Sequence, residues 1–422
     1  MTYEVNEPIL NSPFDEPSRY WFIREGYEPE LREGCRRPSI IYPPRESNTE
    51  WELGQVLKLS PPDEFFPGYE MTLVNRIRKE VKEWREQHYP GVVSRTTLEL
   101  LEYWNREGRQ HRLFFAQKEA VETIIFLTES RADFRQGIHI PQDTPVDATL
   151  KAFIRYACKM ATGSGKTTVM GMLAAWSILN KVSDRSNTKF SDVVLIICPN
   201  VTIKSRLQEL NPDNGEASLY RSRDLVPSHL MDKLRQGKVL VTNWHIFEKR
   251  SPSTAGNDPA KVVKVGVKTT TTEVIKIAGK NETARGTRYL TLESLQQQIT
   301  LGQIKVVEEK KDKQGNLKEV KVETTRYLES DAAWIKRILT QEVGNKGNIL
   351  VFNDEAHHAY RISPSKINDD DDDEVAEYEQ KESTIWIEGL DRIHKYREIN
   401  FCVDLSATPY YLKSSKQNTN KP

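Results

Sequence analysis

Five short apolar runs, separated by stretches with helical spacing, constrain the fold of this 422-residue chain more than any other feature. Continuous apolar runs are typical of strands buried on both faces, and strands that alternate with helices form parallel sheets covered by helices. The runs are Tyr156–Lys159, Val193–Cys198, Val239–Thr242, Ile349–Phe352 and Phe401–Leu405. We therefore expect an α/β fold in which these runs form one parallel sheet.

Small or polar residues follow each of these runs, where a functional site is expected. In open parallel sheets, ligands gather at the carboxyl ends of the strands. The segments concerned are Met160–Thr168, Pro199–Thr202, Thr242–His245, Asp354–His357 and Ser406–Thr408. We therefore expect the functional residues of the chain in these segments.

The first segment, MATGSGKTT, has the composition of a phosphate-binding loop between a strand and a helix. Glycines allow the backbone N–H groups of such a loop to converge on phosphate oxygens, and the helix that follows favours negative charge at its start. Lys166 would reach the β- and γ-phosphates, and the Thr167 hydroxyl would hold Mg²⁺. Met160 stands where such loops usually have glycine, so a Gly/Ser turn before an ordinary helix is the alternative. The predicted nucleotide-binding residues of the loop are Thr162, Gly163, Ser164, Gly165, Lys166, Thr167 and Thr168.

Asp354 and Glu355 form a second chemical motif because they follow a buried strand directly. An aspartate at such a strand end can hold Mg²⁺, and the next carboxylate can accept a proton from a water that attacks a phosphate. Asp354 is therefore the predicted metal residue and Glu355 the predicted base. Acids that merely cap a strand end are the alternative.

Gln117 is the candidate for reading an adenine ring, because its amide can both donate to and accept from the base edge. The preceding Phe115 could stack on the ring. An ordinary surface glutamine is the alternative, but the position upstream of the predicted phosphate loop favours a role in nucleotide binding.

Composition excludes several other classes of protein. Lys plus Arg and Asp plus Glu both number 61, so no global basic field indicates nucleic acid. The four cysteines form no C-x-x-C pair, which argues against a zinc module or a disulfide framework. The N-terminus has no basic segment of the secretory type, and the longest apolar run, Val169–Leu179, is too short to span a membrane. We expect a cytoplasmic protein without membrane contact.

The remaining segments give the domain organisation. Closely spaced prolines in residues 1–70 predict an extended arm that packs on another domain through aromatic side chains such as Phe14 and Phe22, with a disordered tail as the alternative. Helical spacing predicts helices over 72–87 and 94–105.

Alternating residues predict a β-rich insertion over 251–330, whose lysines (Lys261, Lys264, Lys268, Lys276 and Lys280) either contact a DNA backbone or form a solvated edge. The acidic run 369–374 is interpreted as a solvated loop. The expected divisions are the arm (1–70), a helical segment (71–110), the two parts of the sheet domain (111–250 and 331–411), the insertion (251–330) and a polar tail (412–422).

MATGSGKT, NDEAHHAY, LSATPYY, the upstream FFAQKEA and the segment TNWH together resemble the first motor domain of superfamily-two DEAD/DEAH-box helicases. Within that group, the chain is most similar to the Res subunits of type III restriction enzymes. The resemblance is strong over 112–411 and weak in the arm and the insertion. It implies a RecA-like P-loop fold with three layers, and ATP and Mg²⁺ as cofactors.

The resemblance also implies roles and partners that the residues alone do not. Ser406 and Thr408 would couple ATP hydrolysis to movement, and His357 would link the nucleotide to that pair. A single DNA strand would run along Pro199, Thr242 and Asn243. No role is implied for His358.

Related motors hydrolyse ATP between two RecA-like domains, and only a short polar segment follows Thr408. We therefore expect a DNA-dependent ATPase or translocase half that is weak or inactive alone, completed by a second RecA-like domain or subunit and associated in some systems with a methyltransferase subunit. A non-catalytic nucleotide- or DNA-binding remnant is the alternative. A metabolic P-loop kinase is disfavoured, because the DEAH and SAT segments have no purpose there.

Overall fold

The chain consists of two compact units in the computed structural model, which describes residues 9–23, 27–41, 69–143, 145, 149–248, 267–284, 287–300, 304–311, 315–328, 330–343, 346–360 and 374–407. Unit 1 contains 1–243, 345–359 and 397–422, and unit 2 contains 244–344 and 360–396. The boundaries that we placed at 251 and 331 from the sequence both lie inside unit 2. Thr408 and the acidic residues 369–373 lie outside the described residues.

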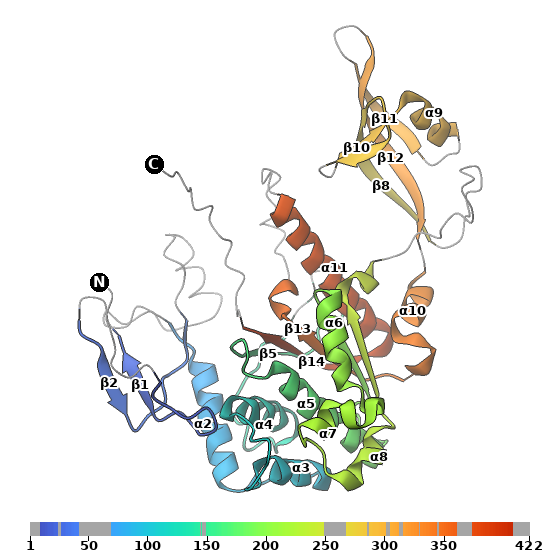
Figure 1. Ribbon diagram of the computed structural model, residues 1–422. Coiled ribbons are helices and arrows are strands. Elements are labelled where there is room, and N and C mark those ends of the chain that lie inside the picture. The colour runs from blue at the N-terminus through green and yellow to red at the C-terminus, as the bar shows by residue number, and fades with distance from the viewer. Residues whose placement is uncertain are drawn as a thin grey trace. The chain divides into compact units, whose positions relative to one another are not determined.

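A five-stranded, all-parallel sheet forms the centre of unit 1, which confirms the α/β fold class. The five apolar runs of the sequence are its strands. Their order in the sheet is β5-β14-β13-β6-β7, so β13 lies at its centre and β14 between β13 and the edge strand β5 (Figure 1). The bounds are β5 Arg155–Lys159, β6 Val193–Cys198, β7 Lys238–Asn243, β13 Ile349–Asp354 and β14 Ile399–Ser406.

The α5 helix (Lys166–Ser183) packs against one face of this sheet, and the two together form the main core. Residues 169–180 of α5 are all buried, as expected for a helix that is apolar on every side. On the sheet, β6 contributes Val194 and Ile196 to the same core, while their neighbours Leu195 and Ile197 are buried too. Helices α3 (Arg95–Asn105) and α4 (Phe115–Glu129) lie beside α5 on the same side of the sheet (Figure 1).

Unit 1 contains further helices besides α4 and α5. The helices predicted over 72–87 and 94–105 are confirmed as α2 (Thr72–Glu86) and α3, and Ser94 caps α3 by accepting the Thr97 N–H. The remaining α-helices are α6 Val201–Leu207, α7 Leu219–Ser222 and α8 Met231–Leu234. Short 3₁₀ turns cover Gln208–Leu210, Pro212–Ala217, Ser228–Leu230 and Ala356–His358.

The described residues of the N-terminal arm form two pairs of short strands. β1 (Arg19–Phe22) pairs antiparallel with β2 (Glu30–Glu33), and β3 (Ile40–Ile41) with β4 (Tyr69–Glu70). The arm contacts the start of α4, as expected from its aromatic residues, because the Phe14 ring lies 5.4 Å from that of Phe114. Residues 42–68 lie outside the described part of the chain.

Unit 2 contains a second sheet with the order β11-β12-β8-β10-β9. Its small core joins the sheet to α9, a helix that we did not predict, through Ile275, Val320 and Leu295. The two strands predicted on either side of residues 314–316 are β11 and β12, which pair antiparallel. Residues 312–314, Lys261 and Lys264 lie outside the described residues. The bounds are β8 Val267–Ile277, β9 Glu282–Ala284, β10 Thr287–Leu290, α9 Leu292–Thr300, β11 Ile304–Lys311, β12 Leu317–Leu328, α10 Asp331–Val343 and α11 Glu374–Arg397, with a 3₁₀ turn over Trp244–Phe247.

Candidate functional site

The loop between β5 and α5 has the backbone conformation that its glycines predict. Gly163 has a φ of +80° and Gly165 a φ of +88°, and Gly165 is the N-cap of α5. Ser164 closes the turn, because its N–H and its hydroxyl both donate to the Ala161 carbonyl oxygen, at 3.1 and 2.6 Å. The first N–H groups of a helix have no acceptor inside the helix, so the end of this loop is suited to an anion.

Gln117 holds this loop against α4. Its amide nitrogen donates to the Ser164 carbonyl oxygen at 3.0 Å, and its carbonyl oxygen accepts the Phe114 N–H at 3.0 Å. A Cβ atom on Gly165 would lie 2.0 Å from the Gln117 amide nitrogen, so any other residue there would displace this amide. The side chain that we predicted to read adenine therefore supports the loop in this structure.

Phe115 is buried instead of lining the loop. Its ring is 7% exposed, and the guanidinium groups of Arg36 and Arg85 lie 5.5 and 5.2 Å from the ring centre. Stacking of a base on Phe115, as the sequence suggested, would require one of these groups to move. The stacking role stays a prediction.

Lys166 and Glu355 meet at the carboxyl edge of the sheet, although they are far apart in the sequence. The Lys166 Nζ lies 3.0 Å from Glu355 Oε1, and both side chains are largely shielded from solvent. Glu355 directly follows β13 with a φ of +51°, a left-handed conformation that is strained for a residue with a side chain. Such strain is common at functional sites, and here it turns the carboxylate toward the loop lysine.

Asp354 is the last residue of β13 and carries a buried carboxyl oxygen without a hydrogen-bond partner. The residue is 1% exposed and the unpartnered atom is Oδ2. Burial raises the pKa of Asp354, and the neighbouring Glu355 raises it further, while Lys166 and Arg206 act in the opposite direction. An orphan buried oxygen is costly unless a ligand satisfies it.

This oxygen fits a role in holding Mg²⁺. The described residues contain no group of three or more His, Cys, Asp or Glu side chains placed to bind a metal. Mg²⁺ commonly takes only one or two protein oxygens and completes its shell with phosphate and water. Asp354, together with Thr167 in the first turn of α5, offers such a donor set.

His357 and Ser406 extend the site across the sheet. The His357 Nδ1 lies 2.9 Å from the Ser406 hydroxyl and 3.6 Å from Glu355 Oε2. Ser406 ends β14, and its carbonyl oxygen accepts the Met160 N–H at 2.9 Å. A closed ring of contacts therefore runs from Lys166 through Glu355, His357 and Ser406 back to the loop. His358 stacks beside His357, with the ring centres 4.3 Å apart.

Pro199, Thr242 and Asn243 lie at the same edge but on the far side of β13. Pro199 follows β6, Thr242 and Asn243 end β7, and Cys198 pairs with Asn243 in the strand register. The Cys198 thiol donates to the Thr242 carbonyl oxygen at 3.2 Å, and burial followed by the charge of Asp354 raises the pKa of this thiol to about 11. The structure thus groups these three residues with one another at the ends of β6 and β7.

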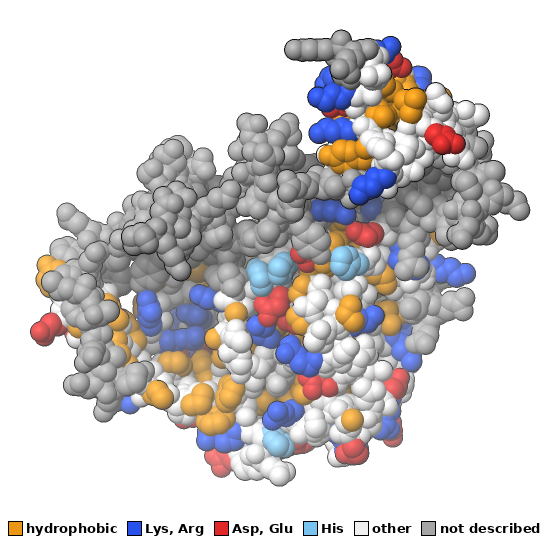
Figure 2. Space-filling view, turned by 45° about the horizontal axis from the view of Figure 1, so that its top comes forward, with side chains coloured by type: hydrophobic (Ala, Val, Ile, Leu, Met, Phe, Trp, Pro, Cys, Tyr) orange, Lys and Arg blue, Asp and Glu red, His pale blue; other side chains and the backbone are white. Residues whose placement is uncertain are grey.

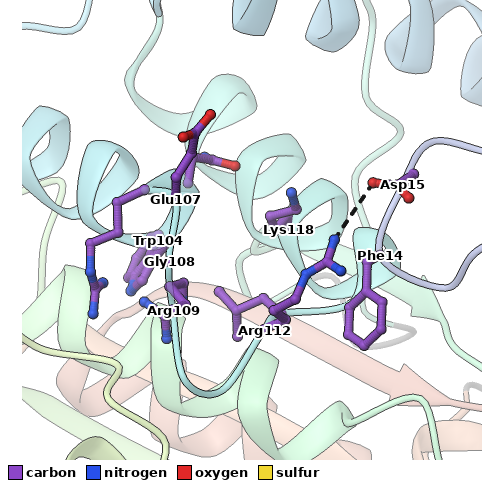
Figure 3. A pocket seen from close by; sticks show the side chains of 11 residues that line it. Phe14, Asp15, Trp104, Glu107, Gly108, Arg109, Arg112 and Lys118 are labelled. Atoms are coloured by element: carbon purple, nitrogen blue, oxygen red, sulfur yellow. Dashed lines mark ion pairs between the residues drawn. The ribbon is translucent and has the colours of Figure 1, made fainter.

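A cavity of about 250 Å³ beside the first turn of α4 was not expected from the sequence (Figure 3). The Arg112 guanidinium lies 4.2 Å from the Phe14 ring centre and 3.8 Å from Asp15. Burial lowers the pKa of Lys118, which also lines the cavity and directly follows Gln117. Phe14 was noted in the sequence for packing only, and no local pattern marks Arg112 or Lys118. Aromatic and guanidinium walls of this kind can stack on a planar ring.

Charges are mixed over the part of the surface that Figure 2 describes. Lys and Arg side chains and Asp and Glu side chains are both scattered over that face, and the sequence contains equal numbers of the two kinds. No helix among the described residues has both the length and the apolar composition that crossing a membrane requires.

Comparison of the chain with protein-family models, with curated proteins and with solved structures found no match.

Proposed function

We propose that unit 1 is an ATP-binding domain of the RecA-like P-loop class, the first motor domain of a DNA-dependent ATPase or translocase similar to the Res subunits of type III restriction enzymes. The observation that carries the proposal is the convergence of Lys166, Asp354 and Glu355 at the edge of the sheet where the glycine loop ends. A lysine, an unpartnered carboxyl oxygen and a second carboxylate are the groups that phosphoryl transfer requires.

The roles of the residues follow from their positions. The Lys166 ammonium, now paired with Glu355 at 3.0 Å, exchanges this partner for phosphate oxygens. Glu355 is thereby released as an acceptor for the proton of an attacking water. Thr167 and Asp354 hold Mg²⁺, which when bound neutralises charge on the phosphate oxygens. His357 connects Glu355 to Ser406, so it can transmit the state of the phosphate to β14.

The partners are proposed on the family resemblance. A DNA strand would pass Pro199, Thr242 and Asn243, which lie together at the edge of the sheet. Because charges are mixed on the described surface, DNA would be held by local contacts, with a second RecA-like domain or subunit completing the catalytic site.

A test compares Lys166→Ala with Lys181→Ala. Lys181 lies at the other end of α5 and donates to the Arg185 and Asn187 carbonyl oxygens. Titration with a fluorescent ATP analogue and Mg²⁺ measures binding. We expect Lys166→Ala to weaken binding by a factor of roughly 10 to 100, the value of one hydrogen bond to a charged group. Lys181→Ala should bind normally.

Turnover of ATP, measured with and without DNA, then separates the two functions that the sequence left open. We expect binding without appreciable turnover by the chain alone, and DNA-stimulated turnover once a second motor domain is supplied. Equal affinity of the two lysine variants would refute the site. Robust hydrolysis by the chain alone would refute its dependence on a second domain, and the absence of stimulation with every partner would favour a non-catalytic binding module.

A further inference from the structure

A buried arginine at the start of β5 joins the three segments that carry the candidate site. The Arg155 guanidinium contacts Asp404 Oδ2 at 2.6 Å and Asp143 Oδ2 at 3.0 Å. It also donates to the Ala359 carbonyl oxygen at 2.8 Å. The Asp404 carboxylate is further fixed by the fully buried Asn353, whose amide donates to Oδ1 at 2.7 Å.

A buried ion pair is weak evidence that a cluster serves stability. The Arg155 and Asp404 side chains are only 13% and 14% exposed, and a buried ion pair is often no more stabilising than apolar side chains of the same volume. The planar guanidinium, however, presents donors in fixed directions and can hold several acceptors at defined positions. The cluster is therefore better suited to positioning than to stabilisation.

Each segment that Arg155 holds leads into the site within a few residues. β5 runs on to Met160 and the glycine loop. Asp404 lies in β14 two residues before Ser406, where that strand ends. Ala359 ends the turn that contains His357. A shift of Arg155 would thus move the two partners of the 2.9 Å contact between His357 and Ser406 relative to each other.

We propose that Arg155, with Asp404, is a positioning residue that sets the contact between His357 and Ser406, and through it lets the site distinguish a nucleoside triphosphate from a diphosphate. This proposal rests on the proposed function, because the discriminated group is the γ-phosphate. Arg155 acts through Asp404 in β14 and through Ala359, which follows the turn that contains His357.

The test uses Arg155→Lys, which keeps the charge but loses the guanidinium fork. The matched control is Arg288→Lys in unit 2, where Arg288 also bridges two partners, Glu273 at 2.9 Å and Gln298 at 2.8 Å. Fluorescent ADP and a non-hydrolysable fluorescent ATP analogue are titrated with Mg²⁺ into the full chain. NMR of the His357 imidazole nitrogens reports its contact with Ser406.

We expect the unsubstituted chain and Arg288→Lys to prefer the triphosphate by a factor of roughly 10 to 100, which one hydrogen bond to a charged group supplies. Arg155→Lys should lose this preference, keep its affinity for ADP, and show shifted His357 resonances. A purely structural role would lower both affinities equally. If Arg155→Lys does not fold, Asp404→Asn, which preserves shape, takes its place with the same expectation.

The outcomes separate the two proposals. A chain that binds neither nucleotide refutes the proposed function. A chain that binds both, with an unchanged preference and unchanged His357 resonances in the variant, refutes the positioning role alone.

Discussion

Replacing Gly165 by alanine tests how the phosphate loop is supported. The φ of +88° is unfavourable for alanine by roughly 1–2 kcal/mol. The new Cβ would also lie 2.0 Å from the Gln117 amide nitrogen, so this amide must leave the Ser164 carbonyl oxygen. Leaving buried hydrogen-bonding groups unsatisfied costs roughly a further 1–3 kcal/mol. We expect Gly165→Ala to destabilise unit 1 by about 2–5 kcal/mol.

Gly163→Ala is the matched control, because Gly163 has a similar φ of +80° and no atom within 4 Å of its missing Cβ. Only the conformational cost of roughly 1–2 kcal/mol applies there. Hydrogen exchange of peptides from α5 at increasing urea concentrations measures the stability of unit 1 by itself. In a Gln117→Ala background the cost of Gly165→Ala should fall to that of Gly163→Ala. Equal costs of the two glycine variants in the unsubstituted background would show that Gln117 does not constrain the loop.

Three further predictions concern other parts of the molecule. Gly389→Ala places a Cβ 2.4 Å from the Phe247 ring in unit 2, so thermal unfolding should show a loss of roughly 1–3 kcal/mol. Burial raises the pKa of Glu129 above 4.5, so its contribution to stability is full below that pH and is lost as the pH rises through the folded pKa. Urea unfolding over a pH series should therefore show Glu129→Gln gaining stability relative to the parent as the pH rises, and a constant difference would contradict the assignment. Asp354→Asn should abolish the Mg²⁺ dependence of nucleotide binding. In the parent this dependence should weaken as the pH falls through the raised pKa of Asp354, and a pH-independent Mg²⁺ effect would count against Asp354 as the metal residue.

The strands of unit 1 could be predicted because their signal is local. Val193–Cys198 is the same run in the sequence and in the structure, and β13 and β14 extend the predicted runs by at most two residues at either end. Their order in the sheet could not be predicted, since nothing in a buried apolar run specifies its neighbour.

The site could be predicted only in part. Residues with a distinctive chemistry at strand ends, such as Lys166 and Glu355, lie together as their positions suggested. The actual contacts of Gln117 depend on where the start of α4 meets the loop, which is a tertiary property. Arg155 gave no signal, because its partner Asp404 is remote in the sequence.

The strand order of unit 1 has a consequence for synthesis of the protein. β13 lies at the centre of the sheet and β14 between β13 and the edge strand β5, yet both leave the ribosome after the other three strands of this sheet. Until then β5 and β6 share no neighbour in the nascent chain, and only the pairing of β6 with β7 is available. Sheet formation that depends on late, long-range strand pairing is slow. Until it is complete, apolar strand edges are exposed to chaperones and to aggregation. The ends of β5, β13 and β14 meet only in that last step, so a translation intermediate has no complete nucleotide site.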